Sequence, residues 1–341
     1  MIAQSAAARD WQPRAGALVT DSAELFRLLG LDPAQLPAAL AASRDFPLKV
    51  PRSYVRRMRV GDPHDPLLLQ VLAQGVELEP VPGFSADPLD EQAFVPVPGI
   101  LHKYHGRVLL MATGACAIHC RYCFRRHFPY QEHVPDRERL DAALAWLHAR
   151  DDIDEVILSG GDPLSLSDRR LRELLAALAA LPQLRRLRIH TRLPLVMPER
   201  TSEALVAMLA AFPRPVVIVL HANHGNEIDA EVVEVCARLR GAGVTLLNQS
   251  VLLRGINDSA GVLADLSGRL FDAGVLPYYL HQLDAVAGAA HFAVDDEQAL
   301  ALQRQLQASL PGYLVPRLVR ETPHGDSKTL VFAPDPTNPG G

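Results

Sequence analysis

The stretch HGRVLLMATGACAIHCRYC, residues 105–123, decides the fold. It opens with an apolar run over Val108–Met111 and then places three cysteines, Cys116, Cys120 and Cys123, within eight residues. A short apolar run of this kind predicts a buried strand, and the thiols follow where that strand ends. Chemically active residues at the carboxyl end of a strand are typical of α/β enzymes.

Beyond this strand, apolar runs alternate with amphipathic stretches. Five more strands are predicted at Glu155–Leu158, Leu187–Ile189, Val216–Leu220, Val244–Leu247 and Leu276–Leu280. Helices are predicted at Asp136–Ala149, Asp168–Leu181, Glu199–Ala211, Ala230–Gly241 and Ala260–Ala273. Six βα units in tandem imply parallel strands with right-handed crossovers. Because polar residues follow the end of every strand, we predict the α/β fold class and a partial (β/α)6 TIM-like barrel rather than an open sheet.

The chain divides into three predicted parts. Residues 1–100 form a mainly helical wrapping lead-in, residues 101–310 the barrel core, and residues 311–341 a C-terminal segment with a frayed tail. Helix starts in the lead-in are predicted at the capping residue Asp21 and at Asp32, which precedes a proline. From there to the barrel, frequent Pro and Asp residues predict few long elements.

Composition excludes several classes of protein. Of the 341 residues, 48% are hydrophobic and 21% charged, which are values of a globular domain. The net charge of −5 disfavours a nucleic-acid partner. The first residues lack the apolar core of a signal peptide, and no apolar stretch reaches the ~18 residues of a membrane span, so we expect a cytoplasmic protein. Lysine is scarce: only Lys49, Lys103 and Lys328 occur, and each is a candidate for chemistry that needs a deprotonatable amine.

Three explanations of the cysteines can be compared. Reduced core cysteines are disfavoured because His119, Arg121 and Arg125 lie among them. A structural zinc site needs four ligands, and the fourth would have to be His119, His127 or Cys236, the last of which we expect in the core. Three thiolates fit an iron–sulfur cluster that leaves one iron open to another ligand.

The Cx3Cx2C spacing, with Tyr122 before the third cysteine, resembles the radical S-adenosylmethionine enzymes. The segments ILSGGDPL (157–164), NQSVLLRGIND (248–258) and YYLHQLDAVAGAAHF (278–292) narrow the resemblance to the lysine 2,3-aminomutase family over roughly residues 60–330. The resemblance implies a [4Fe–4S] cluster on the three cysteines, S-adenosyl-L-methionine at the open iron, and pyridoxal 5′-phosphate as a second cofactor. It also implies an isomerase that acts on L-lysine, with an electron donor of the flavodoxin or ferredoxin type.

The same resemblance assigns residues to S-adenosylmethionine. Gly160, Gly161 and Asp162 match the motif that binds the methionine amino group, and His221 and Gln249 match contacts to the same molecule. Glycines let a backbone approach a ligand, and the neighbouring acid accepts from an ammonium. Taken alone, His221 and Gln249 are equally well explained as hydrogen-bonded core residues.

For the second cofactor, the resemblance implies that Lys328 is the residue that holds pyridoxal phosphate, and it places Lys103, Tyr104 and Arg107 near the phosphate. Lys103 stands where the aminomutases have an arginine. Lys328 follows a strand-like run, Tyr313–Val319, that we expect to close against the barrel. Without the resemblance, Lys328 reads as a solvated loop lysine.

Substrate recognition is assigned by resemblance to Arg125, Asp284 and Glu321. A guanidinium fork suits an amino acid carboxylate, and the two acids match carboxylates that take the side-chain ammonium of lysine. The alternative for Arg125, together with Arg121 and Arg126, is a loop of solvated charge.

Three departures separate this chain from catabolic lysine 2,3-aminomutases. The segment His324–Ser327 replaces a glycine-rich run, Glu321 replaces an aspartate, and the chain ends 13 residues after Lys328. These features resemble the EpmB-type branch, which makes (R)-β-lysine that a separate ligase attaches to elongation factor P. Open alternatives are a stand-alone lysine 2,3-aminomutase, a radical enzyme without pyridoxal phosphate, and a non-catalytic iron–sulfur or zinc protein. A further hypothesis is that the lead-in encloses the site against water.

Overall fold

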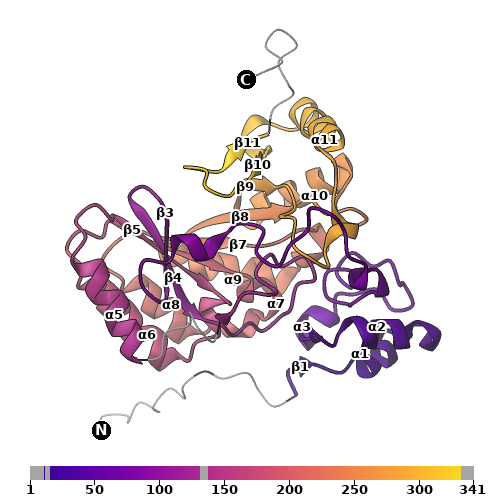
Figure 1. Ribbon diagram of the computed structural model, residues 1–341, viewed down its shortest axis with the longest axis horizontal. Helices are drawn as coiled ribbons and strands as arrows, with labels where there is room; N and C mark the ends of the chain where they lie inside the picture. Colours follow the sequence, from indigo (N-terminus) through magenta and orange to yellow (C-terminus); the bar gives the residue numbers. More distant parts are fainter. Residues whose placement is uncertain (1–10, 12–15, 131–136, 332–341) are drawn as a thin grey trace.

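The computed structural model describes residues 11, 16–130 and 137–331 (Figure 1). Within them, nine strands form one sheet in the order β11-β10-β9-β8-β7-β6-β5-β4-β3. All neighbours from β4 to β10 are parallel, whereas β3 and β11 pair antiparallel at the two edges. The bounds are β3 Ile100–Tyr104, β4 Arg107–Thr113, β5 Glu155–Gly160, β6 Arg186–Thr191, β7 Val216–Leu220, β8 Thr245–Val251, β9 Leu276–His281, β10 Arg317–Arg320 and β11 Thr329–Leu330.

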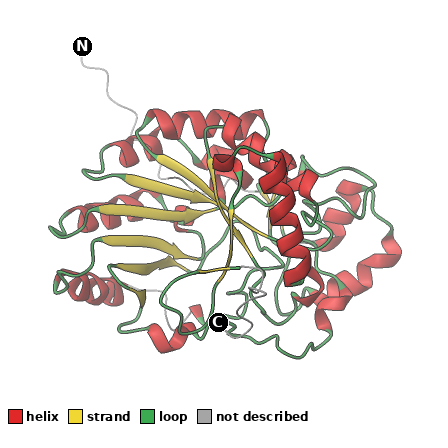
Figure 2. Ribbon diagram, turned by 90° about the horizontal axis from the view of Figure 1, so that it is seen from above, coloured by secondary structure: helices red, strands yellow, loops and turns green. Residues whose placement is uncertain are grey.

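The six predicted strands are confirmed as β4 to β9. Strands β5 and β7 are almost entirely buried, as their near-continuous apolar runs indicate. Figure 2 shows the strands fanning out with helices around them. The prediction of a strand over Tyr313–Val319 is partly wrong, because a 3-10 turn, η8, occupies Gly312–Leu314 and the strand begins only at Arg317. Pro311 and Pro316 flank that turn and favour irregular backbone there.

Several helices that cross between strands begin at side-chain caps, such as Ser167 for α6 and Asp229 for α9. The bounds are α5 Arg137–His148, α6 Asp168–Ala179, α7 Leu193–Val196, α8 Glu203–Ala210, α9 Ala230–Gly241, α10 Ala260–Asp272 and α11 Asp296–Ser309. The predicted helix from Glu199 is interrupted, because residues Pro198–Arg200 form the 3-10 turn η5 and Ser202 caps a new start. Helix α11 was not predicted, and the predicted start of α5 at Asp136 lies outside the described residues.

The lead-in is built from short elements. Strands β1 (Leu18–Val19) and β2 (Val50–Pro51) pair antiparallel. The other elements are α1 Ser22–Leu29, η1 Pro33–Gln35, α2 Leu36–Ala42, α3 Arg52–Val55, η2 Gly75–Leu78 and η3 Glu91–Phe94. The predicted caps are confirmed, since Asp21 accepts from Ala23 N and Asp32 from Ala34 N.

One apolar cluster runs from the lead-in into the barrel and includes Leu25, Tyr54 and Leu68 together with Val156 and Leu187. Shared burial of this kind stabilises the two parts together. The three-part division of the chain stays a prediction, and residues 332–341 of the expected tail lie outside the described ones. Among the described helices, none has the length and apolar character needed to cross a membrane.

Candidate active site at the carboxyl ends of the strands

The three thiols of Cys116, Cys120 and Cys123 lie on the loop after β4 and are not disulfide-bonded. Burial, reinforced by the neighbouring thiols, raises the pKa of Cys123 to about 11 and also raises the pKa of Cys116. Within the described ranges, no three His, Cys, Asp or Glu side chains are gathered around a single-metal position. The loop therefore offers sulfur donors that need a nearby cation to ionise, and sulfur is the donor of iron–sulfur clusters.

The cysteine loop is fixed by the backbone of the lead-in. His119 N donates to Lys49 O at 2.9 Å, and Arg121 N donates to Gln70 O at 2.8 Å. His119 Nδ1 also lies 2.8 Å from Pro47 O, which leaves His119 committed to the lead-in. The loop conformation is thus set by contacts with residues far away in the sequence.

The arginines of this loop are not solvated. Arg121 is fully buried and donates through Nε to Glu77 at 2.9 Å, while Arg126 Nη2 reaches the same carboxylate at 3.0 Å. Arg125 forms a bidentate pair with Glu91 of η3, at 2.7 Å from Nε and 2.6 Å from Nη2. Sequence reasoning missed Glu77 and Glu91, because each is recognisable only once the lead-in is placed against the loop.

The glycines after β5 allow the cysteine loop to approach. Gly161 N donates to Thr113 O at 2.6 Å, and Asp162 N donates to Ala115 O at 2.8 Å. A Cβ on Gly161 would lie 2.4 Å from Ala115 O, and Gly160 has a positive φ of 114°. The sequence predicts that these glycines let the backbone approach a ligand. In the structure, the segment that approaches them is the start of the cysteine loop.

The carboxylate of Asp162 is surrounded by protein donors. Its Oδ1 accepts from Thr191 Oγ1 at 2.7 Å and Leu164 N at 3.0 Å, and its Oδ2 accepts from Arg192 N at 2.7 Å and Leu193 N at 3.1 Å. These bonds join the ends of β5 and β6. The role expected for Asp162 toward an ammonium stays a prediction, and an ammonium would have to share the carboxylate with these donors.

Neutral imidazoles line the interior near the strand ends. Gln249 Nε2 lies 3.1 Å from His221 Nε2, and the rings of His190 and His221 are 5.7 Å apart. Burial lowers the pKa of His221 to about 3 and also lowers the pKa values of His190 and His281 well below the usual range. In the part of the chain that the structure describes, Nε2 of His190 and Nε2 of His281 have no hydrogen-bond partner. Both residues come directly after predicted strands, so the sequence marked their positions but assigned them no role.

Lys328 lies in a polar cluster that spans the two edges of the sheet. Its Nζ is 2.6 Å from Glu321 Oε2, and Tyr104 OH donates to Glu321 Oε1 at 2.8 Å. Lys103 Nζ donates to Thr322 O at 2.7 Å and lies 3.5 Å from Glu321 Oε1. Burial opposes ionisation, but Lys328, Tyr104 and Lys103 together lower the pKa of Glu321 to about 2. Glu321 is therefore a charged acceptor for three side chains.

Asp284, after β9, is the second carboxylate of this cluster. Burial first, and then the charge of Glu321, raise the pKa of Asp284 to about 7. A cation arriving at Asp284 would favour its charged form. Its environment is therefore suited to accept an ammonium.

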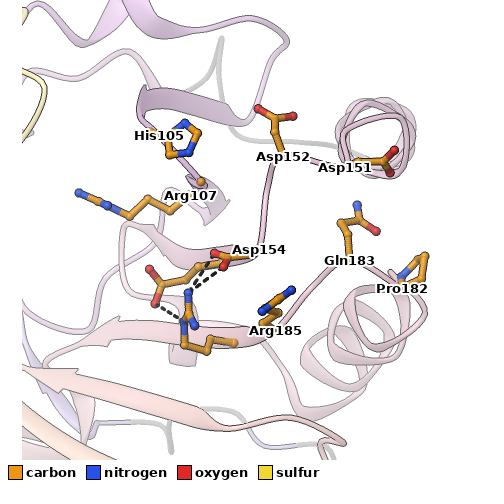
Figure 3. A pocket seen from close by; sticks show the side chains of 11 residues that line it. His105, Arg107, Asp151, Asp152, Asp154, Pro182, Gln183 and Arg185 are labelled. Carbon is orange, nitrogen blue, oxygen red and sulfur yellow. Dashed lines mark hydrogen bonds and ion pairs between the residues drawn. The ribbon is translucent and has the colours of Figure 1, made fainter.

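Arg107 lies on the other side of Tyr104, with its guanidinium carbon 4.7 Å from the ring centroid. It also lines a surface hollow of about 560 Å³ at the amino ends of β5 and β6 (Figure 3). The charges there are partly paired, as between Arg186 and Asp154 at 3.0 Å. Because the hollow contains none of the thiols and not Lys328, we place the candidate site at the opposite ends of the strands.

The chain is similar to proteins of known family. Residues 110–266 match the Radical SAM superfamily. The chain is 52% identical to an L-lysine 2,3-aminomutase of Escherichia coli, over 94% of each chain, and 46% identical to one of Haemophilus influenzae, over 92% of each. An L-lysine 2,3-aminomutase of Clostridium subterminale is 35% identical over 95% of this chain and 78% of the relative.

Proposed function

The chain belongs to the L-lysine 2,3-aminomutase family and is an isomerase of the radical S-adenosylmethionine type, and on this premise we propose that it converts L-lysine to (R)-β-lysine with the help of pyridoxal phosphate. A [4Fe–4S] cluster, S-adenosylmethionine and pyridoxal phosphate are the cofactors of this family. We further propose the EpmB-type destination for the product, which is attachment to elongation factor P by a separate ligase.

The observation that carries the proposal is that two positively charged side chains lie near the same buried imidazoles. Burial is the main reason that the pKa values of His190 and His221 are low, and the charges of Lys328, at the C-terminal edge of the sheet, and Arg125, on the cysteine loop, lower both as smaller contributions. The amine of Lys328 and the loop that carries both Arg125 and the thiols therefore lie near the same two imidazoles. That arrangement is what a reaction with two cofactors and one substrate requires.

In this proposal Cys116, Cys120 and Cys123 hold the cluster, and Lys328 holds pyridoxal phosphate. When bound, the cluster and S-adenosylmethionine supply a hydrogen-abstracting radical, and pyridoxal phosphate carries the migrating nitrogen. Gly160, Gly161, Asp162, His221 and Gln249 are the proposed S-adenosylmethionine contacts, and Lys103, Tyr104 and Arg107 the proposed phosphate-side residues.

The remaining work falls to charged side chains that bind and orient lysine. Arg125 is proposed to bind the substrate carboxylate through Nη1, which Glu91 does not contact and which donates to Ser159 Oγ at 3.3 Å. Asp284 and Glu321 are proposed to bind the side-chain ammonium, whose charge would hold Asp284 in its ionised form. The lead-in is proposed to exclude water from the site, which would protect a reactive radical.

Support for the EpmB-type branch comes from the chain itself. Glu321 occupies the position of an aspartate in the catabolic enzymes, and the His324–Ser327 segment replaces their glycine-rich run. The E. coli relative is matched over 94% of its length, against 78% for that of C. subterminale. Use of the product then requires a ligase and elongation factor P as partners. The reaction itself requires a reductant of the flavodoxin or ferredoxin type, and we propose the cytoplasm as its site.

The test is anaerobic incubation of the reconstituted protein with labelled L-lysine, reductant and S-adenosylmethionine. Chiral analysis of the 3,6-diaminohexanoate should give the R product, and Lys328→Ala should give none. Absence of amino migration in a preparation that carries both cofactors would contradict the reaction. The destination is tested separately by adding the ligase and elongation factor P and following transfer of the label to the factor. The product of a stand-alone aminomutase need not be transferred to the factor.

A further inference from the structure

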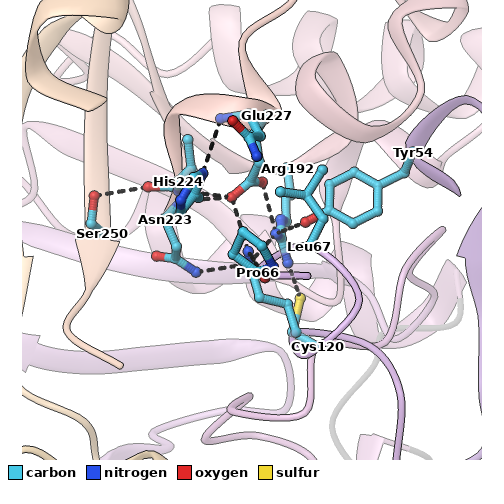
Figure 4. Close-up of polar contacts among 12 residues, drawn as sticks. Tyr54, Pro66, Leu67, Cys120, Arg192, Asn223, His224, Glu227 and Ser250 are labelled. Atoms are coloured by element: carbon cyan, nitrogen blue, oxygen red, sulfur yellow. Dashed lines mark hydrogen bonds and ion pairs between the residues drawn. The ribbon is translucent and has the colours of Figure 1, made fainter. Parts of the chain in front are cut away.

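A buried guanidinium contacts the middle cysteine of the loop. Arg192 directly follows β6 and is 5% exposed. Its Nη1 lies 2.8 Å from Cys120 Sγ, while its Nη2 lies 2.8 Å from Glu227 Oε2 and 3.0 Å from Tyr54 OH (Figure 4). Sequence reasoning passed over Arg192, since it is one of many arginines and its partners are distant in the chain.

The guanidinium is held in one orientation. Arg192 N donates to Asp162 Oδ2 at 2.7 Å, and Arg192 Nη2 also donates to Gln70 Oε1 at 2.5 Å. Glu227 is fixed in turn, because its Oε1 accepts from Asn223 N at 2.8 Å. Figure 4 shows Tyr54, Cys120 and Glu227, which come from different segments, around Arg192. The contacts of Nη2 with Tyr54, Gln70 and Glu227 thus hold Nη1 next to the sulfur.

Two opposite charges therefore lie beside one thiol, with the positive charge in contact with it and the negative charge farther away. Arg192 is next to Cys120, and Glu227, which is fully buried, lies behind Arg192. A hydrogen bond and a positive charge at a cluster sulfur favour the state with one more electron, because hydrogen bonds to sulfur and local net charge tune cluster potentials. A buried carboxylate behind the cation has the opposite effect.

We propose that Arg192 is a positioning residue that orients Cys120 and raises the reduction potential of the cluster, and that Glu227 limits this increase. The proposal rests on the proposed function, since it requires Cys120 to be a cluster ligand. The electron enters from the flavodoxin or ferredoxin type donor, and Arg192 changes how readily the cluster accepts it. Arg192 takes no part in the proposed contacts to lysine or pyridoxal phosphate.

The test is an anaerobic redox titration of the reconstituted protein, followed by the electron paramagnetic resonance signal of the reduced cluster. Arg192→Gln should lower the ratio of reduced to oxidised cluster at a fixed potential about tenfold, equivalent to about 59 mV for one electron. Glu227→Gln should shift the ratio in the opposite direction. Arg192→Lys, which keeps the charge, should restore part of the wild-type potential.

A matched control is Arg200→Gln. Arg200 is also fully buried and pairs with Asp168 at 2.8 Å, but it donates to Leu164 O rather than to a thiol. Loss of this guanidinium should lower stability and leave the potential unchanged. Equal potentials in all variants that hold a cluster, or shifts of one sign for Arg192→Gln and Glu227→Gln, would overturn the proposal.

The outcomes separate this inference from the function it rests on. If the wild-type protein binds no iron and sulfide, the proposed function fails. If it binds a cluster whose potential ignores both Arg192 and Glu227, only this inference fails. Should Arg192→Gln take up no cluster, the opposite shifts expected for Arg192→Lys (down) and Glu227→Gln (up) still decide the question.

Discussion

The carboxylate of Glu91 accepts two hydrogen bonds from the guanidinium of Arg125, at 2.7 Å from Nε and 2.6 Å from Nη2. Their side chains are only 13% and 8% exposed, so removal of either partner would leave the other charge buried and unpaired. Glu91 belongs to η3 in the lead-in, whereas Arg125 belongs to the cysteine loop. The lead-in is therefore fastened to the residue proposed to bind the substrate carboxylate, as the enclosure hypothesis requires.

Glu91→Ala should loosen this fastening and admit water. We expect the ratio of S-adenosylmethionine cleaved to β-lysine formed to rise several-fold, measured as methionine released per product. Glu79→Ala is the control, because Glu79 is an exposed acid of the same lead-in. An unchanged ratio in Glu91→Ala would count against enclosure by this segment.

Gly161→Ala should displace the cysteine loop, since the new Cβ would lie 2.4 Å from Ala115 O and 2.7 Å from Gly114 C. We expect a loss of about 1–3 kcal/mol in stability and a reduced iron content after reconstitution. The control is Gly241→Ala, where a Cβ meets nothing within 4 Å. Normal iron binding by Gly161→Ala would show that the close approach is not needed.

Asp284→Asn should change how stability depends on pH. The pKa of Asp284 is raised to about 7 by burial, so the folded protein favours the protonated acid. The stability from this preference is complete below the unfolded pKa near 4 and is lost as pH rises through about 7. Asparagine does not ionise, so the variant should gain, relative to wild type, on the order of 4 kcal/mol at high pH and little at low pH.

Urea unfolding of the ligand-free protein near pH 5 and above pH 8 measures this difference. A gap between variant and wild type that does not widen with pH would contradict the assignment. The same variant should bind lysine more weakly, because the proposed ammonium partner is gone. Stability and binding should thus change in opposite directions.

Lys328 should be the residue to which pyridoxal phosphate becomes attached. Borohydride reduction followed by peptide mass spectrometry should label the Lys328 peptide, and only Lys49 and Lys103 compete in this sequence. Lys328→Ala should abolish the label and the cofactor absorbance. Lys103→Ala is the comparison, since its amine contacts Thr322 O and Glu321 without being the proposed attachment point. Label on another lysine would refute the assignment.

The order of strands and most helices could be predicted from sequence, because apolar runs and caps are local signals. Ser167 and Asp229 mark helix starts within four residues of the contacts they make. The 3-10 turn at Pro198–Arg200 was missed because residues 199–203 are all polar and do not show where the helix begins. The three cysteines were found for the same reason as the strands, since their spacing is local.

The partners of the site could not be found in this way. Glu91 and Arg125 are 34 residues apart, and Arg192 and Cys120 are 72 apart. Contacts of this length depend on where the fold places whole segments, so no short pattern marks them. Asp162 shows the complementary case: its motif was noticed, but its bonds to Thr191 and Arg192 N appear only once β5 and β6 lie side by side.

The sheet has two free edges in the described chain, and side chains rather than backbone pairing connect them. Tyr104 and Lys103 of β3 reach Glu321 and Thr322 after β10. The flank can therefore part without unravelling a strand, at the cost of a few side-chain bonds. Since the Lys328 amine is bonded to Glu321, covalent occupation of that amine removes one contact from this connection. Binding of the cofactor to Lys328 should therefore weaken the connection between β3 and the segment after β10. Faster amide exchange in β3 would reveal this change.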